Sequence, residues 1–182
     1  NRGDHLTVSL PERSRVELNF HAVNLELLFS QSPFLEVGIF STVKPFKTEI
    51  VASDKGGDED EKPKEFHDVY VQPVDLATER QAQKLDAFLW HSPNVKAKVI
   101  EDEGFAYVYV DGKAKPGAYC KVYAKDNSNT RFFKDGYTDL QGKFKYITSD
   151  IEGIQTFAIL FLTEQGGIVK YARKPNTVGT IG

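Results

Sequence analysis

The stretch that decides the fold is residues 115–146, which read KPGAYCKVYAKDNSNTRFFKDGYTDLQGKFKY. Apolar and polar residues alternate in it with the period of two that is typical of strands with one buried face. The alternation is interrupted by Pro-Gly at 116–117, Asp-Asn-Ser-Asn at 126–129, Asp-Gly at 135–136 and Gln-Gly at 141–142. Turn signals about every eight to twelve residues indicate a β-sandwich or a β-barrel.

The same pattern continues on both sides of this stretch. We expect strands at residues 95–101, 105–110, 119–124, 130–134, 143–147, 156–162 and 168–172. Residues 157–162, FAILFL, are apolar without interruption. A continuous apolar run of this length predicts a central strand that is covered on both faces.

The first half of the chain also predicts strands, at residues 5–10, 15–29, 34–40, 46–52, 66–71 and 87–91. Within 15–29 the apolar residues fall first on even positions, such as Val16 and Leu18, and then on odd ones, such as Leu25 and Leu27. A one-residue slip inside a strand predicts a β-bulge, here near residues 22–24. After Asp75 good helix formers predict a helical turn or two.

The chain has a charged segment and a clear place to divide. Residues 54–65, DKGGDEDEKPKE, predict a solvated loop because they offer little to bury. Pro93-Asn94 marks the expected boundary between two modules, 1–92 and 93–175, with a tail at 176–182. A chain of 182 residues accommodates two modules of about 80 to 90 residues each.

The second module resembles a known family. KPGAYCKVYA at 115–124 and GYTDLQGKFKY at 136–146, followed by an apolar strand, resemble the carboxypeptidase-regulatory-like and transthyretin-like sandwiches of large multi-module proteins. The resemblance spans residues 95–173 and implies a Thr-Asp-x-x-Gly-x-Phe hairpin. In that hairpin Asp139 bonds its own backbone, Gly142 takes a positive φ and Phe144 enters the core. The expected fold class is all-β, with two β-sandwich modules, immunoglobulin-like or transthyretin-like, in tandem.

Composition excludes several classes of function. The net charge is −3 and the 23 Lys and Arg residues are scattered, whereas a nucleic-acid binder is expected to show a basic face. No apolar run reaches the length of about 18 residues that a membrane-spanning helix needs. The chain contains no Met, so we expect it to be a processed product or a piece of a longer protein.

The sequence offers no pattern of catalytic, cofactor-binding or metal-binding residues. The acidic run Asp58–Glu61 lacks the ordered spacing of a calcium loop. Cys120 lies in an apolar strand pattern, where a thiol is usually a small buried hydrophobe. Four histidines stand far apart without the spacing of a zinc site: His5, His21, His67 and His91. We therefore expect no enzyme and no cofactor.

Aromatic side chains are the candidates for contact with a ligand or partner, and Trp90, Tyr107, Tyr109 and Tyr137 are the ones we select. In residues 105–109, FAYVY, two orientations remain open. In the first orientation, the aromatic side chains at the odd positions line the edge of the core with their hydroxyls at its rim. In the second, the residues at the even positions form the core and the rings stand outside it.

These observations favour a non-catalytic structural or protein-interaction module, a terminal piece of a larger or self-assembling protein. We expect its partners to be other protein chains or copies of itself, joined through open strand edges. The alternative is a carbohydrate-binding module attached to an enzyme, with the tyrosines and Trp90 stacking on a glycan. The compartment stays open, with a lean toward the cell surface or the extracellular space.

Overall fold

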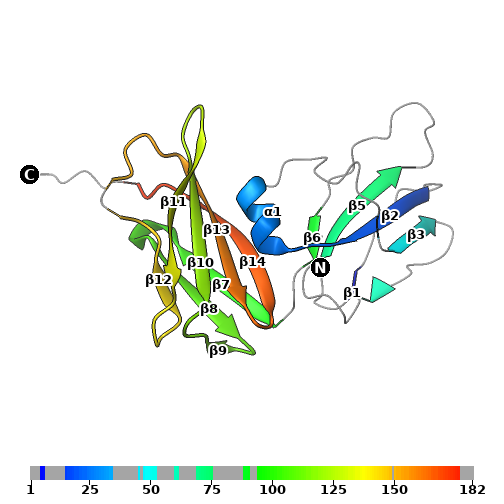
Figure 1. The fold of residues 1–182 in the computed structure, drawn as a ribbon, viewed down its shortest axis with the longest axis horizontal. Coiled ribbons are helices and arrows are strands. Elements are labelled where there is room, and N and C mark those ends of the chain that lie inside the picture. The colour runs from blue at the N-terminus through cyan, green and yellow to red at the C-terminus, as the bar shows by residue number, and fades with distance from the viewer. Residues whose placement is uncertain are drawn as a thin grey trace, which may run out of the picture. The chain divides into compact units, whose positions relative to one another are not determined.

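The computed structural model describes residues 5–6, 15–34, 45, 47–52, 60–61, 69–75, 88–90, 94–148 and 150–176. The chain divides into two compact units (Figure 1). The first unit comprises Asn1–Leu28 with Leu35–Pro93, and the second comprises Phe29–Phe34 with Asn94–Gly182. Strands dominate the described part of both units, which confirms the all-β fold class.

The first unit contains a four-stranded antiparallel sheet in the order β3-β2-β5-β6. Its strands are β2 (Arg15–Ala22), β3 (Lys47–Ala52), β5 (Val69–Asp75) and β6 (Phe88–Trp90). Two short strands, β1 (His5–Leu6) and β4 (Asp60–Glu61), pair with each other. Part of the acidic segment that was expected to be a loop is therefore a strand.

The chain after β2 differs from the expectation. Val16, Leu18 and Phe20 are buried on one face of β2, as expected, but the strand ends at Ala22 and no bulge follows. Helix α1 (Leu25–Gln31) begins there instead.

Asn24 is the physical reason for this helix. Its Oδ1 accepts a hydrogen bond from the backbone N–H of Leu27 at 3.0 Å, which is the geometry of a helix N-cap. Leu25, Leu28 and Phe29 are buried while Leu27 is exposed, and this spacing of three and four residues is helical. Of the strand expected at residues 34–40 only Phe34 is described, and it lies in a turn. Phe46 and the helical turns expected after Asp75 lie outside the described residues.

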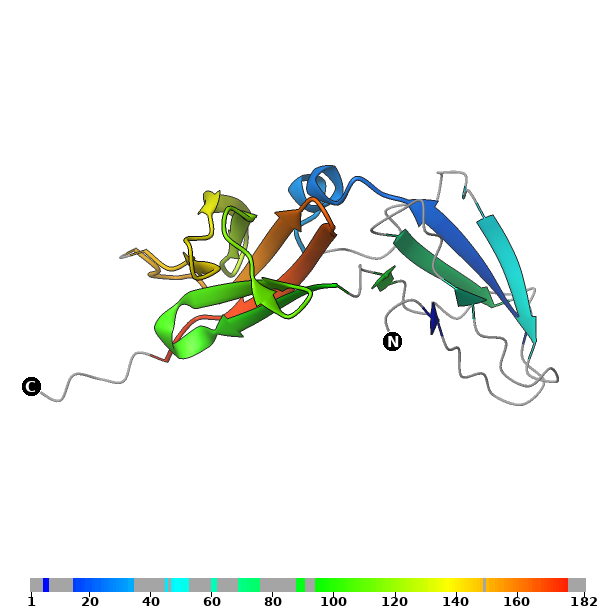
Figure 2. The ribbon, with the colours of Figure 1, turned by 90° about the horizontal axis from the view of Figure 1, so that it is seen from below.

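The second unit contains two antiparallel sheets (Figures 1 and 2). One sheet has the order β11-β10-β13-β14, formed by β10 (Tyr119–Lys125), β11 (Thr130–Tyr137), β13 (Thr156–Thr163) and β14 (Gly166–Arg173). The other has the order β12-β8-β7, with β9 also paired to β8; its strands are β7 (Val95–Ile100), β8 (Phe105–Val110), β9 (Lys113–Ala114) and β12 (Lys143–Lys145). A 3₁₀ turn, η1 (Glu101–Glu103), joins β7 to β8.

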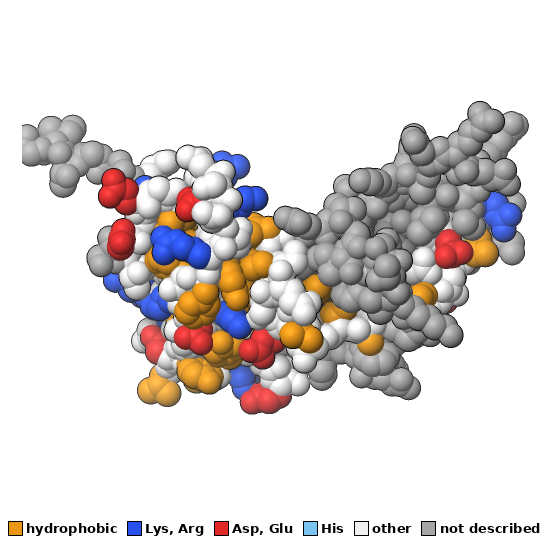
Figure 3. Space-filling view, turned by 45° about the horizontal axis from the view of Figure 1, so that its top comes forward, with side chains coloured by type: hydrophobic (Ala, Val, Ile, Leu, Met, Phe, Trp, Pro, Cys, Tyr) orange, Lys and Arg blue, Asp and Glu red, His pale blue; other side chains and the backbone are white. Residues whose placement is uncertain are grey.

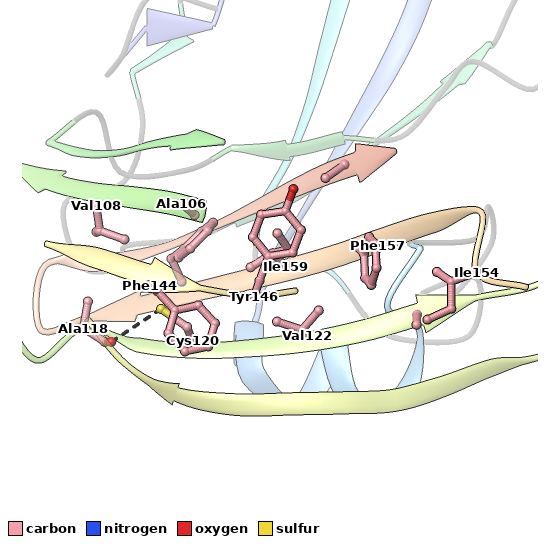
Figure 4. Packing of buried hydrophobic residues seen from close by; sticks show 13 residues of the cluster. Ala106, Val108, Ala118, Cys120, Val122, Phe144, Tyr146, Ile154, Phe157 and Ile159 are labelled. Carbon is pink, nitrogen blue, oxygen red and sulfur yellow. Dashed lines mark hydrogen bonds between the residues drawn. The ribbon is translucent and has the colours of Figure 1, made fainter. Parts of the chain in front are cut away.

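The core of the second unit lies between these sheets (Figure 4). Every second residue of β10 points into this core, and so does its neighbour on β13. Cys120 therefore lies opposite Phe161, and Val122 lies opposite Ile159. The rings of Tyr146 and Phe157 meet at 5.6 Å in this cluster. Phe144, 6% exposed, packs here as predicted.

Strand β13 is also covered on its other face. Ala158 and Leu160 are fully buried although they point away from the core cluster. Their cross-strand neighbours Tyr123 and Lys121 contact the segment Phe29–Phe34: the Tyr123 and Phe29 rings lie 5.5 Å apart, and Lys121 Nζ donates to Ser30 Oγ at 2.8 Å. The central, doubly covered strand is thus confirmed (Figure 2).

Asp135-Gly136 is not a turn, contrary to the expectation, but lies inside β11. Gly136 stands opposite Cys120 on the core side of the sheet. A Cβ built on Gly136 lies 2.9 Å from Cε2 of the Phe144 ring. A side chain at this position would therefore require the Phe144 ring to move.

The Thr-Asp-x-x-Gly-x-Phe turn forms, but the two strands that it joins do not make a hairpin. Asp139 Oδ1 accepts hydrogen bonds from the N–H groups of Gln141 and Lys143 at 2.9 and 3.0 Å, and Gly142 has φ 72°. Strand β11 before the turn pairs with β10, whereas β12 after it pairs with β8. The turn therefore carries the chain from one sheet to the other.

Thr138 fixes the start of this crossing. Its Oγ1 accepts from the N–H of Ala118 at 2.9 Å and donates to the carbonyl of Lys115 at 2.6 Å. We predict that Thr138→Val, which keeps the shape but loses both hydrogen bonds, lowers the free energy of unfolding by about 2 kcal/mol. Thr138→Ser keeps both bonds and serves as the control in urea denaturation. Equal losses for the two variants would contradict the role of the hydroxyl.

Candidate functional site

The outer side of the β12-β8-β7 sheet presents aromatic and basic side chains. Ala106 and Val108 of β8 are fully buried in the core, so the alternate residues Phe105, Tyr107 and Tyr109 point outward and are half-buried. This decides between the two orientations that the sequence left open, in favour of rings that stand outside the core.

Lysines flank this row of rings on both neighbouring strands. Tyr107 lies opposite Lys98 on β7 and Lys143 on β12. Tyr109 lies opposite Lys96 on β7, and Phe105 lies opposite Lys145 on β12. We call this set the lysine–aromatic face; it consists of Lys96, Lys98, Phe105, Tyr107, Tyr109, Lys143 and Lys145.

The outer side of the other sheet is aromatic too, but its rings are tilted. The Tyr119 and Tyr137 rings lie 5.5 Å apart with an interplanar angle of 53°, and Tyr123 meets Phe132 at 5.9 Å and 83°. Tyr119 donates its hydroxyl to Asp135 at 2.9 Å. Tyr137 is 68% exposed at the edge of the sheet. No flat aromatic platform is present among these two pairs.

The three selected tyrosines of the second unit lie on two different sheets. Tyr107 and Tyr109 share the lysine–aromatic face, whereas Tyr137 lies on the outer side of the opposite sheet. Trp90 ends β6 in the first unit. Their role in contacting a ligand or partner stays a prediction.

The four lysines are not recognisable as one surface in the sequence, because they lie in two places about 45 residues apart. A signal was present in the two Lys-x-Lys pairs at 96–98 and 143–145. Alternate residues of a strand point to the same side, so each pair places two cations on one face. On the side of the second unit that Figure 3 shows, cationic, anionic and apolar side chains are interspersed.

Several polar groups with shifted pKa values hold turns together. Hydrogen bonds from the backbone N–H groups of Ser128 and Asn129 lower the pKa of the exposed Asp126. The hydrogen bond from Lys115 Nζ, at 2.9 Å, and its charge lower the pKa of the exposed Glu164. These carboxylates stabilise loops between strands.

Titratable groups in the core are shielded from solvent. Burial, with smaller contributions from Glu101 and Asp102, raises the pKa of Tyr146 to about 12. Within the described ranges, no three His, Cys, Asp or Glu side chains are grouped as metal ligands. None of the described helices is long and apolar enough to cross a membrane.

Cys120 is fully buried, and burial raises the pKa of its thiol to about 12. Its Sγ lies 3.6 Å from the carbonyl oxygen of Ala118, to which it donates (Figure 4). At pH 8 the native thiolate fraction is then about one part in ten thousand. We predict that a disulfide reagent modifies Cys120 orders of magnitude more slowly in the native chain than in denaturant. Complete modification within the mixing time under native conditions would contradict this.

Comparisons with known proteins place both halves of the chain in one structural class. Residues 1–85 match the family model of the AbpF seventh immunoglobulin-like domain, and residues 94–177 match that of the AbpF C-terminal domain. Actin-binding protein F of Dictyostelium discoideum is 33% identical over an alignment of 171 residues that covers 88% of this chain. The chain spans 7% of the length of that protein.

Two solved structures share the fold. Both are crystal structures of native alpha-2-macroglobulin from Escherichia coli. The one spanning domains NIE-MG1 has a TM-score of 0.55 at 10% identity and covers 92% of this chain and 87% of that one. The one spanning MG0-NIE-MG1 has a TM-score of 0.52 at 14% identity and covers 93% and 61%.

These matches support the β-sandwich architecture, and the matching family models are those of AbpF rather than carboxypeptidase-regulatory-like or transthyretin-like ones. Each half of the chain matches its own model, and both models describe domains of the same protein. The chain therefore consists of two immunoglobulin-like β-sandwich domains in tandem, similar to the seventh immunoglobulin-like domain and the C-terminal domain of AbpF.

Proposed function

We propose that the chain is a non-catalytic protein-interaction unit of a longer protein and that its partner is actin. The observation that carries the proposal is the similarity to actin-binding protein F, which extends over 88% of this chain and thus over both domains. Immunoglobulin-like sandwiches bind partners through surface side chains and strand edges, and fold alone does not define the partner. The partner therefore has to be tested directly.

Co-sedimentation with filamentous actin tests this proposal. The 182-residue chain is expected to pellet with filaments in a saturable manner and to stay in the supernatant without them. An unrelated immunoglobulin-like domain of similar net charge serves as the control for trapping. A chain that remains in the supernatant at every filament concentration would remove actin as the partner of this unit.

Self-association through a strand edge is a second candidate, and strand β11 favours it. β11 is the outermost strand of its sheet and runs for eight residues, Thr130–Tyr137. An outer strand presents unpaired backbone groups on one side, which can pair with a second copy. Light scattering after size exclusion, over a concentration series, is expected to show a mass that rises with concentration. A constant monomer mass would exclude this mode.

The carbohydrate-binding alternative gains no support from the ring geometry. Sugar binding on a flat sheet requires coplanar rings, whereas the Tyr119–Tyr137 and Tyr123–Phe132 pairs are tilted by 53° and 83°. The Phe34 and Tyr171 rings are stacked on each other at 21°, so one face of each ring is covered by the other ring although Tyr171 is 48% exposed.

A further inference from the structure

The lysine–aromatic face gathers four positive charges that are distant in the sequence. Lys96 and Lys98 are exposed on β7, and Lys143 and Lys145 extend from β12 on the far side of β8. Neighbouring strands lie about 4.8 Å apart, so the two rows of lysines are separated by roughly 10 Å across the aromatic row. Partner side chains can therefore reach both rows at once.

The chain does not neutralise this charge within the part that the structure describes. The ion pairs found there join Lys47 to Glu49 and Lys115 to Glu164, and none involves the lysines of the face. Acidic residues close to the face in sequence are those of η1, which connects the end of β7 to the start of β8. Glu101 of this turn accepts a hydrogen bond from the backbone N–H of Arg173. Uncompensated charges of one sign on one face create a local positive potential.

The rings of the face fix the cations and offer apolar area. Lys143 Nζ lies 3.8 Å from the centroid of the Phe105 ring and 5.8 Å from that of Tyr107. Lys145 Nζ lies 6.0 Å from Phe105. Such cation–π contacts hold an ammonium group near the surface in a defined position. Aromatic residues are enriched in the core of protein-binding surfaces, and the rim of such surfaces is polar.

The same geometry disfavours nucleic acid as the ligand of the lysine–aromatic face. Bases stack on free ring faces, but Lys143 covers the face of Phe105. The net charge of the chain is −3, whereas a nucleic-acid-binding domain is usually strongly basic.

We propose that the lysine–aromatic face binds an acidic surface of a partner protein, with carboxylates of the partner on the two lysine rows and an apolar side chain on the tyrosines between them. This inference rests on the proposed function in so far as the partner is a protein, and it does not require the partner to be actin.

Charge reversal tests the proposal. Lys98→Glu with Lys143→Glu removes one cation from each row, and Lys125→Glu with Arg131→Glu makes the same change in net charge on the other sheet. The probes are filamentous actin and a poly-glutamate peptide at low salt. We expect the face variant to weaken binding by about tenfold or more and the control variant by less than about twofold. Circular dichroism and the melting midpoint establish that each variant is folded. If the face variant does not fold, Lys96→Gln with Lys98→Gln, both exposed on an edge strand, replaces it.

The outcomes separate this inference from the proposed function. Poly-glutamate binding that depends on the face, without actin binding, supports the face and removes actin. Actin binding that both variants retain, without poly-glutamate binding, supports actin and overturns the face. Binding to neither probe overturns both. Phosphatidylserine vesicles and single-stranded DNA are measured in parallel, and tighter, face-dependent binding to either than to poly-glutamate overturns the protein assignment.

Discussion

Phe144→Ala is expected to unfold or nearly unfold the second domain. The ring is 6% exposed and belongs to the core cluster between the two sheets. Its edge fills the space that Gly136 leaves, and Lys134 Nζ lies 5.1 Å from its centroid. Truncating a buried phenylalanine costs about 3 to 5 kcal/mol, a large part of the stability of a domain of this size. Urea denaturation followed by fluorescence measures the loss.

Phe132→Ala is the matched control for this change. Phe132 is 49% exposed on the outer side of β11, where it meets Tyr123. The Phe132→Ala variant should lose about 1 kcal/mol or less of its free energy of unfolding, because half of the ring already contacts water. Similar midpoints for Phe144→Ala and Phe132→Ala would show that the register of β11 and β12 is wrong, since a one-residue slip exchanges the inner and outer faces.

Gly142→Ala is expected to be the second most damaging change. Gly142 has φ 72°, and a Cβ there lies 2.7 Å from the carbonyl oxygen of Val108 and 3.0 Å from the backbone nitrogen of Lys115. Both contacts are with backbone that takes part in the pairing of β8, because Val108 N–H donates to Gly142 at 2.8 Å and Lys115 N–H donates to Val108 at 2.9 Å. We expect a loss of about 3 kcal/mol, from the left-handed conformation together with the displaced strand.

Gly112→Ala separates these two contributions. Gly112 has φ 76° but nothing within 4 Å of a Cβ, so alanine there meets only the conformational cost, about 1 to 2 kcal/mol. The difference between the two variants in thermal or urea unfolding measures the contact with Val108. Equal losses would show that the turn does not lie against β8.

The strands of the second domain could be predicted because each rests on local alternation. Strand β8 begins and ends at the predicted residues, Phe105 and Val110, and Asp111-Gly112 after it forms a tight turn with φ 51° and 76°. A buried face and a turn that requires positive φ are both visible in a few neighbouring residues.

Features that depend on tertiary contacts could not be predicted. The alternation in residues 15–29 fits a bulged strand, and the helix is chosen by the hydrogen bond of Asn24 and by the burial of Leu28 and Phe29. The turn at Asp139 shows the same limit: its hydrogen bonds are local, but the sheet that β12 joins is decided by pairing with β8, far away in the sequence.

The candidate site was predicted only in part for a related reason. Tyr107 and Tyr109 are recognisable from their alternation, yet the lysines beside them come from β7 and β12 and meet only when those strands pair with β8. Sequence shows which residues share a strand face, whereas strand order decides which faces adjoin. Tyr137 was grouped with them by residue type and lies on the other sheet.

Acetylation footprinting of lysines, with and without filamentous actin, tests whether actin binds through the lysine–aromatic face. The method measures the reactivity of each lysine side chain by mass spectrometry. It therefore shows both whether actin binds and which lysines it covers. We predict that actin slows the acetylation of Lys96, Lys98, Lys143 and Lys145, while Lys125 on the other sheet reacts at an unchanged rate. Unchanged rates at all four lysines of the face, or slowing confined to Lys125, would contradict it.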